Sequence, residues 1–76
     1  MSLHPSTFEY LKPTVAQQNK MGMARTYSAN YASNLEQLLP DGPDKTYILR
    51  RVRETAMWIN VALTREADGA PRKDGP

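Results

Sequence analysis

The sequence predicts an all-α fold, an antiparallel two-helix hairpin with a short N-terminal arm or helical turn. Two long segments carry apolar residues three and four positions apart, which is the spacing of an amphipathic helix. A Pro-Asp-Gly-Pro turn at residues 40–43 separates them. The 76 residues then form one domain, residues 1–66, followed by a tail. The expected parts are an arm (1–13), a helix (14–39), a turn (40–43), a helix (43–65) and a tail (67–76).

Capping signals support the arm and the first helix. Ser6 and Glu9 have capping-box spacing, which allows one helical turn before Pro13. Thr14 and Gln17 form a second box at the start of the long segment. The apolar face that follows consists of Ala24, Ser28, Tyr31, Leu35 and Leu38, widened by Met21, Tyr27 and Leu39.

The second helix begins in the turn, where Asp41 or Gly42 can serve as the N-cap and Pro43 fits the first helical position. The connection is so short that the two helices must pack antiparallel. The tail has Gly, Pro and charge but little apolar content, which predicts disorder. The face expected in the seam carries Ile48, Val52, Thr55, Ile59, Ala62 and Leu63.

A second face of the same helix, away from this seam, also carries apolar residues. A single hairpin would leave Met57, Trp58 and Val61 in water, and such a patch marks an interface. Burying one large aromatic side chain removes about 150–250 Å² from water, roughly 4 to 6 kcal/mol by area. A chain this short, without cysteine, has a marginal core of its own. We therefore expect a homo-oligomer built through this face.

Composition excludes several classes of function. Ten Lys and Arg against eight Asp and Glu give a net charge of only +2, too weak a balance to predict binding to long nucleic acids. The sequence has no apolar run long enough to span a membrane and no signal-peptide pattern, so we expect a cytoplasmic protein. With no cysteine and one histidine, no metal site or cofactor is expected. No nucleophile, acid–base pair or phosphate loop is evident, so we expect no enzyme.

Aromatic rings and guanidinium groups are the remaining chemistry. Rings stack on planar bases and guanidinium groups bind phosphate oxygens, so an oligomer that gathered them would suit a phosphorylated ligand with a base. Simpler roles stay open: Trp58 as interface core, Arg65 as a complement to the helix dipole, and Tyr10 as a staple on the hairpin. His4 is assigned no role. The candidates are Tyr10, Tyr27, Tyr47, Trp58, Arg25, Arg51 and Arg65.

One family has a similar order of motifs. The run "FEYLKPT", then Gln17, Met21 and Arg25, then "LLPDGPDKTYILRRVRETAMWINVALTR", resembles the small phage anti-CBASS proteins. These are cyclic-nucleotide sponges related to the hairpin domain of the Thoeris-blocking sponges. The resemblance covers residues 8–65, and its most specific elements are the F-x-Y arm, the acidic turn and the "MWxN" run.

The resemblance implies a homohexamer of hairpins that performs no chemistry in the cytoplasm of an infected bacterium. Members bind cyclic dinucleotides between paired protomers, and some also hold cyclic trinucleotides at three-fold sites. By position, Tyr10 matches the arm tyrosine that closes on a base, and Arg25 and Arg65 match residues that meet phosphate. Trp58 and Asn60 match the "MWxN" run, expected to shape the pocket, and Tyr27 replaces a small polar residue near the phosphate.

Two other functions compete with a sponge. A protein-interaction hairpin would use the face of Met57, Trp58 and Val61 on a host or phage partner. A minor nucleic-acid binder would use Arg50, Arg51 and Arg53, although these alternate with Glu54 in the manner of a solvated, salt-bridged face. Ile59, Val61 and Leu63 replace smaller or differently shaped residues of the family, so the resemblance does not predict the volume of a ligand pocket.

Overall fold

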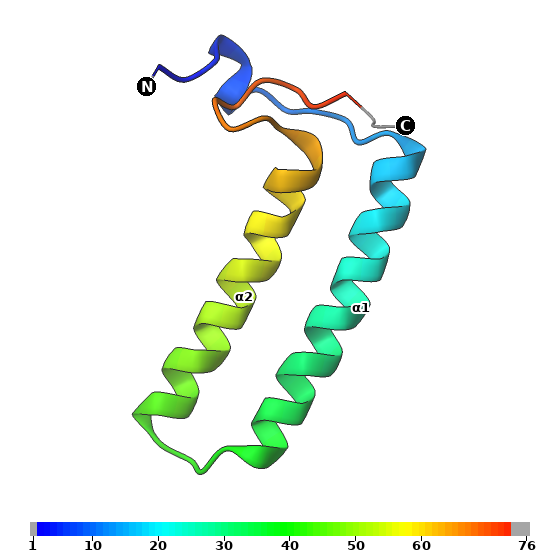
Figure 1. The fold of residues 1–76 in the computed structure, drawn as a ribbon. Coiled ribbons are helices and arrows are strands. Elements are labelled where there is room, and N and C mark those ends of the chain that lie inside the picture. The colour runs from blue at the N-terminus through cyan, green and yellow to red at the C-terminus, as the bar shows by residue number, and fades with distance from the viewer. Residues whose placement is uncertain (1, 74–76) are drawn as a thin grey trace.

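The computed structural model describes residues 2–73, and these form a helical hairpin. A 3-10 turn, η1 (Pro5–Phe8), precedes two long helices, α1 (Val15–Leu38) and α2 (Pro43–Thr64). The helices pack against each other and run in opposite directions (Figure 1). The N-terminal arm and the segment after α2 cross the same end of the hairpin, opposite the turn. The expected all-helical hairpin is confirmed, and each helix ends within one residue of the predicted position.

Helix α1 begins at the predicted capping box. The Gln17 N–H donates to Thr14 Oγ1 at 3.1 Å, and the Thr14 N–H donates to Gln17 Oε1 at 2.9 Å. These bonds satisfy two groups at a helix end that would otherwise lack partners. Gln17 is 6% exposed, and its Nε2 also donates to the Arg72 carbonyl at 3.4 Å. The start of α1 is therefore fixed both locally and by the end of the chain.

Helix α2 begins at Gly42, one of the two expected N-caps. Gly42 has φ 151°, a conformation that favours glycine, and Pro43 occupies the first turn of the helix. Lys45 Nζ lies 3.0 Å from a carboxylate oxygen of Asp41, across the turn. This ion pair is exposed on the Asp41 side, so the turn conformation depends mainly on Gly42 and Pro43.

The seam between the helices buries few side chains completely. Ile48, Val52, Ile59 and Leu63 are half-buried as predicted, but among residues 2–73 no apolar side chain is fully buried. The seam prediction was wrong for five residues that are exposed: Tyr27, Tyr31, Leu38, Thr55 and Ala62. One partner helix covers only a narrow stripe of another, so residues at the edges of a broad apolar face stay in water. The half-buried residues not expected in the seam include Ala32, Leu49, Ala56 and Asn60.

The chain is extended for its size. Its Cα radius of gyration is 15.2 Å, whereas a compact domain of this length has about 11 Å. Its accessible surface is 6234 Å², whereas a compact monomer of 8.6 kDa exposes about 4,700 Å². A single hairpin thus leaves roughly 1,500 Å² more in water than a compact monomer of its mass does.

The structure differs from the predicted tail and from the predicted arm cap. The composition of the tail predicted disorder, whereas in the structure a turn at Gly69, with φ 95°, folds residues 67–73 back beside the end of α2. Arg65 and Pro71 form an isolated antiparallel bridge. Residues 74–76 of the predicted tail lie outside the described residues. In the arm His4, not Ser6, caps the turn, because its Nδ1 accepts the Ser6 N–H at 3.1 Å.

Candidate functional site

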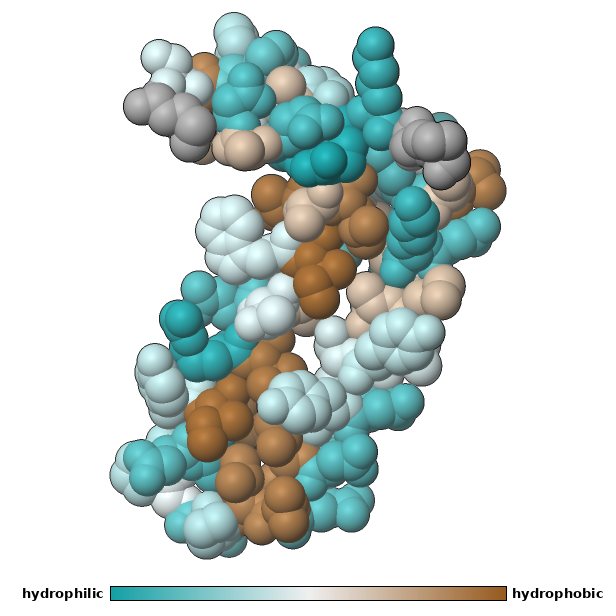
Figure 2. Space-filling view, in the orientation of Figure 1, coloured by the Kyte–Doolittle hydropathy of each residue, from teal (hydrophilic) through white to brown (hydrophobic). Residues whose placement is uncertain are grey.

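One hollow of the hairpin is an open groove between the two helices, with a volume of about 570 Å³. We call it the interhelical groove. Its floor is apolar and comes from Ile48, Val52 and Ile59 of α2. Figure 2 shows apolar side chains gathered between the helices, mainly toward the turn. The other lining residues are Tyr27, Ser28, Tyr31, Tyr47, Arg51 and Thr55.

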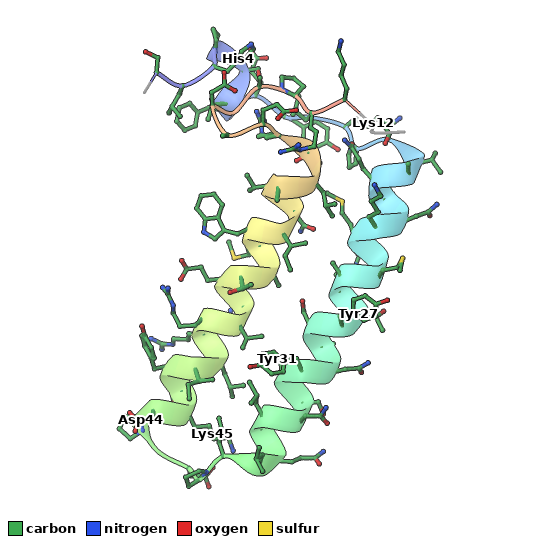
Figure 3. All side chains as sticks on the ribbon, in the orientation of Figure 1. His4, Lys12, Tyr27, Tyr31, Asp44 and Lys45 are labelled. Atoms are coloured by element: carbon green, nitrogen blue, oxygen red, sulfur yellow. The ribbon has the colours of Figure 1, made fainter. Side chains whose placement is uncertain are left out.

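The rim of this groove carries three aromatic rings and one cation. Tyr27, Tyr31 and Tyr47 are all more than half exposed, and Figure 3 shows Tyr31 extending from α1 toward α2. The Arg51 guanidinium lies 6.0 Å from the centroid of the Tyr47 ring and 3.0 Å from a Glu54 oxygen. Such a surface ion pair contributes less than about 1 kcal/mol, so an anion can compete for Arg51. Rings beside an available cation suit a planar, negatively charged ligand.

A smaller hollow of about 290 Å³ lies between α2 and the crossing segments. Trp58 and Val61 form its helix side, and Leu3 and Thr7 come from the arm. Trp58 is 63% exposed, so its ring stands at the edge of this hollow and is not enclosed by it. The remaining lining residues are Arg65, Glu66, Ala67 and Gly69.

The six predicted ligand residues are not gathered in one pocket of the single chain. Trp58 and Arg65 share the smaller hollow, and Tyr27 lies in the interhelical groove. Tyr10, Arg25 and Asn60 line neither of them. Tyr10 is 85% exposed in the arm, Arg25 is exposed on α1, and Asn60 is half-buried in α2. The single chain therefore does not form one pocket from all six residues.

Arg65 already binds protein groups in the single chain. Its Nη1 donates to the Ser6 carbonyl at 2.8 Å and to the Gly69 carbonyl at 2.7 Å. Its Nη2 donates to the Glu9 carbonyl. The guanidinium thus joins the arm to the tail, and three of the five N–H donors of an arginine are used. These hydrogen bonds were not predicted from the sequence, which gave Arg65 either as a complement to the helix dipole or as a phosphate ligand.

The apolar patch predicted on α2 is exposed. Met57 and Trp58 are each 63% exposed, and Val61 is 40% exposed. We call these three residues the Trp58 patch. They lie on α2 but do not line the interhelical groove, so the hairpin has two separate surfaces available for contact.

Sequence reasoning missed the interhelical groove. The sequence pattern placed Tyr27 and Tyr31 in the seam and gave Tyr47 and Arg51 only as candidate ligand residues, whereas all four line one groove. The available signal was spacing: Tyr27 and Tyr31, and likewise Tyr47 and Arg51, are four residues apart and share a helix edge. Long side chains at such edges can bridge the space between two helices. The periodicity of apolar residues does not predict this arrangement.

Within residues 2–73 no group of three or more acidic or histidine side chains could hold a metal ion. In the same part of the chain, neither helix has the length and apolar character needed to cross a membrane. Comparison of the chain with known protein families, with curated proteins and with solved structures finds no match.

Proposed function

We propose that the protein is a sponge that binds cyclic oligonucleotide second messengers without cleaving them. In this proposal it blocks CBASS signalling in the cytoplasm of an infected bacterium, holding cyclic dinucleotides and, at a second type of site, cyclic trinucleotides. The order of motifs from Phe8 to Arg65, similar to that of the anti-CBASS sponges, is the first support. The second is the set of exposed rings and cations that the hairpin presents, which suit bases and phosphates.

The exposure of Tyr10 is the observation that carries the proposal. Its ring is 85% exposed, although the carbonyl of the preceding residue, Glu9, is bonded to Arg65. An aromatic ring held in water on an anchored segment is available to stack on a base, and such stacking contributes about 1–3 kcal/mol per base. The roughly 1,500 Å² of excess surface supports assembly into a homo-oligomer, with a hexamer as the expected form.

Isothermal titration against a panel of cyclic dinucleotides and trinucleotides tests this function. We expect at least one messenger to bind at micromolar protein or below and to be recovered intact after incubation. Tyr10→Ala should weaken binding by about 10- to 100-fold, whereas Tyr10→Phe, which keeps the ring, should bind nearly as the parent does. If no messenger of the panel binds, the sponge function is excluded.

A protein-interaction module is the second candidate, and the exposed Trp58 patch favours it. In that case the hairpin would be a monomer or dimer on its own. It would capture a host or phage protein through Trp58 in the absence of any nucleotide. Measuring the native mass alongside the titration separates the two candidates, because a sponge of the expected type is a larger oligomer before ligand is added.

A further inference from the structure

Contacts between the arm and the segment after α2 form a compact unit, which we call the clasp. Arg65 is at its centre, because one guanidinium donates to carbonyls of the arm (Ser6 and Glu9) and of the tail (Gly69). The planar guanidinium holds its donors in a fixed geometry, so it fixes these carbonyls relative to one another. A lysine at the same place has one nitrogen and cannot reproduce that arrangement.

Gly69 fits the tail closely against the arm. It is buried and has φ 95°, and a Cβ at this position would overlap the Thr7 hydroxyl and lie 3.0 Å from Thr7 Cβ. Beside it, the Asp68 carbonyl accepts the His4 N–H at 2.6 Å and the Thr7 hydroxyl at 3.4 Å. Both the backbone conformation and the available space therefore require glycine here.

The tail side of the clasp is itself attached to both helices. Arg72 Nε donates to the Ala62 carbonyl at 2.9 Å and to the Arg65 carbonyl at 3.2 Å, which satisfies acceptors at the end of α2. The Arg72 carbonyl accepts from Gln17 of α1 at 3.4 Å. The arm is thus held on a tail that is fixed to the hairpin.

We propose that Arg65 and Gly69 are positioning residues that hold the arm and thereby set the place of Tyr10. Tyr10 follows Glu9, the residue whose carbonyl Arg65 binds, so this anchored carbonyl is one residue from the ring. The effect on ligand binding rests on the proposed function, whereas the fastening of the arm does not. In this proposal Arg65 affects ligand binding through the position of Tyr10. The fixed geometry of its guanidinium donors produces this effect, and its positive charge does not.

Three variants separate positioning from direct phosphate contact. Arg65→Lys keeps the charge and loses the fixed geometry, and Gly69→Ala opens the clasp without changing any charge. Gly22→Ala is the matched glycine control, because a Cβ there meets only the flexible end of Arg25, at 3.7 Å. For each variant, amide hydrogen exchange reports the clasp at two N–H groups: that of His4, which donates to the Asp68 carbonyl of the tail, and that of Glu9, which donates to the Ser6 carbonyl within the arm. Titration with the messenger that binds best to the parent reports function.

We expect Arg65→Lys and Gly69→Ala each to raise arm exchange by about tenfold or more and to weaken ligand binding by a similar factor. Helical circular dichroism and exchange within α2 should stay unchanged, and Gly22→Ala should match the parent in the arm. Unchanged arm exchange in Arg65→Lys overturns the clasp, even if Gly69→Ala fails to fold. Faster arm exchange with parental affinity in Gly69→Ala overturns the positioning of Tyr10. If the parent binds no messenger, the proposed function and the link to Tyr10 fail together. The exchange data then test only whether Arg65 and Gly69 hold the arm.

Discussion

Replacing Trp58 by alanine should weaken self-association and leave the single hairpin intact. Trp58 is 63% exposed, which for a side chain that can bury up to about 250 Å² leaves roughly 160 Å² in water. Covering that area contributes about 4 kcal/mol, and ordering the side chain costs about 1 kcal/mol. The remaining 3 kcal/mol or so corresponds to association weaker by on the order of 100-fold.

Sedimentation equilibrium over a series of protein concentrations measures this effect. Tyr47→Ala is the matched control, because Tyr47 is also 63% exposed and lies on α2, but in the interhelical groove and not in the Trp58 patch. Circular dichroism should show the same helix content in both variants. Equal association of Trp58→Ala and the parent would refute the assignment of the patch as an interface, and a monomeric parent at micromolar concentration would refute assembly altogether. An effect of Tyr47→Ala alone would place the interface in the groove.

Two changes in α1 should alter stability by amounts that follow from its local structure. Thr14→Ala removes the acceptor for the Gln17 N–H and should lower the free energy of unfolding by about 1 kcal/mol. Thr14→Ser keeps a hydroxyl acceptor and should retain most of the parent's stability. Equal melting temperatures of the two variants would contradict the role of the cap. Gly22→Ala should raise the free energy of unfolding by about 0.5–1 kcal/mol, because alanine lowers the conformational entropy of the unfolded chain. The added methyl group fits, since it meets only Arg25 at 3.7 Å. A lower thermal midpoint than the parent would show that the helix is crowded there.

Local signals predicted the helices well. The Thr14–Gln17 box and the Gly42–Pro43 start are determined by residues within four positions of each other, so sequence spacing is sufficient to place them. The exposure of Met57, Trp58 and Val61 also followed from periodicity, because a hairpin offers α2 only one partner.

Contacts between distant segments could not be predicted in the same way. The tail composition predicts disorder, but its order depends on Gly69 meeting Thr7 and on Arg72 reaching the end of α2. Likewise, the interaction of Arg65 with Ser6 and Glu9 joins residues more than fifty positions apart, and nothing in the spacing of either segment indicates it. The ligand set remains a prediction, because the single chain does not bring its six residues together.

The clasp also has a consequence for the order of folding. Ser6 and Arg65 are 59 positions apart, and closing a flexible loop of that length in an unfolded chain has a large entropy cost. The contacts between α1 and α2 need only the closure of a short turn, and they bring the two chain ends to the same end of the hairpin. We therefore expect the hairpin to form first and the clasp to close afterwards, with refolding slowed little by variants that affect the clasp alone.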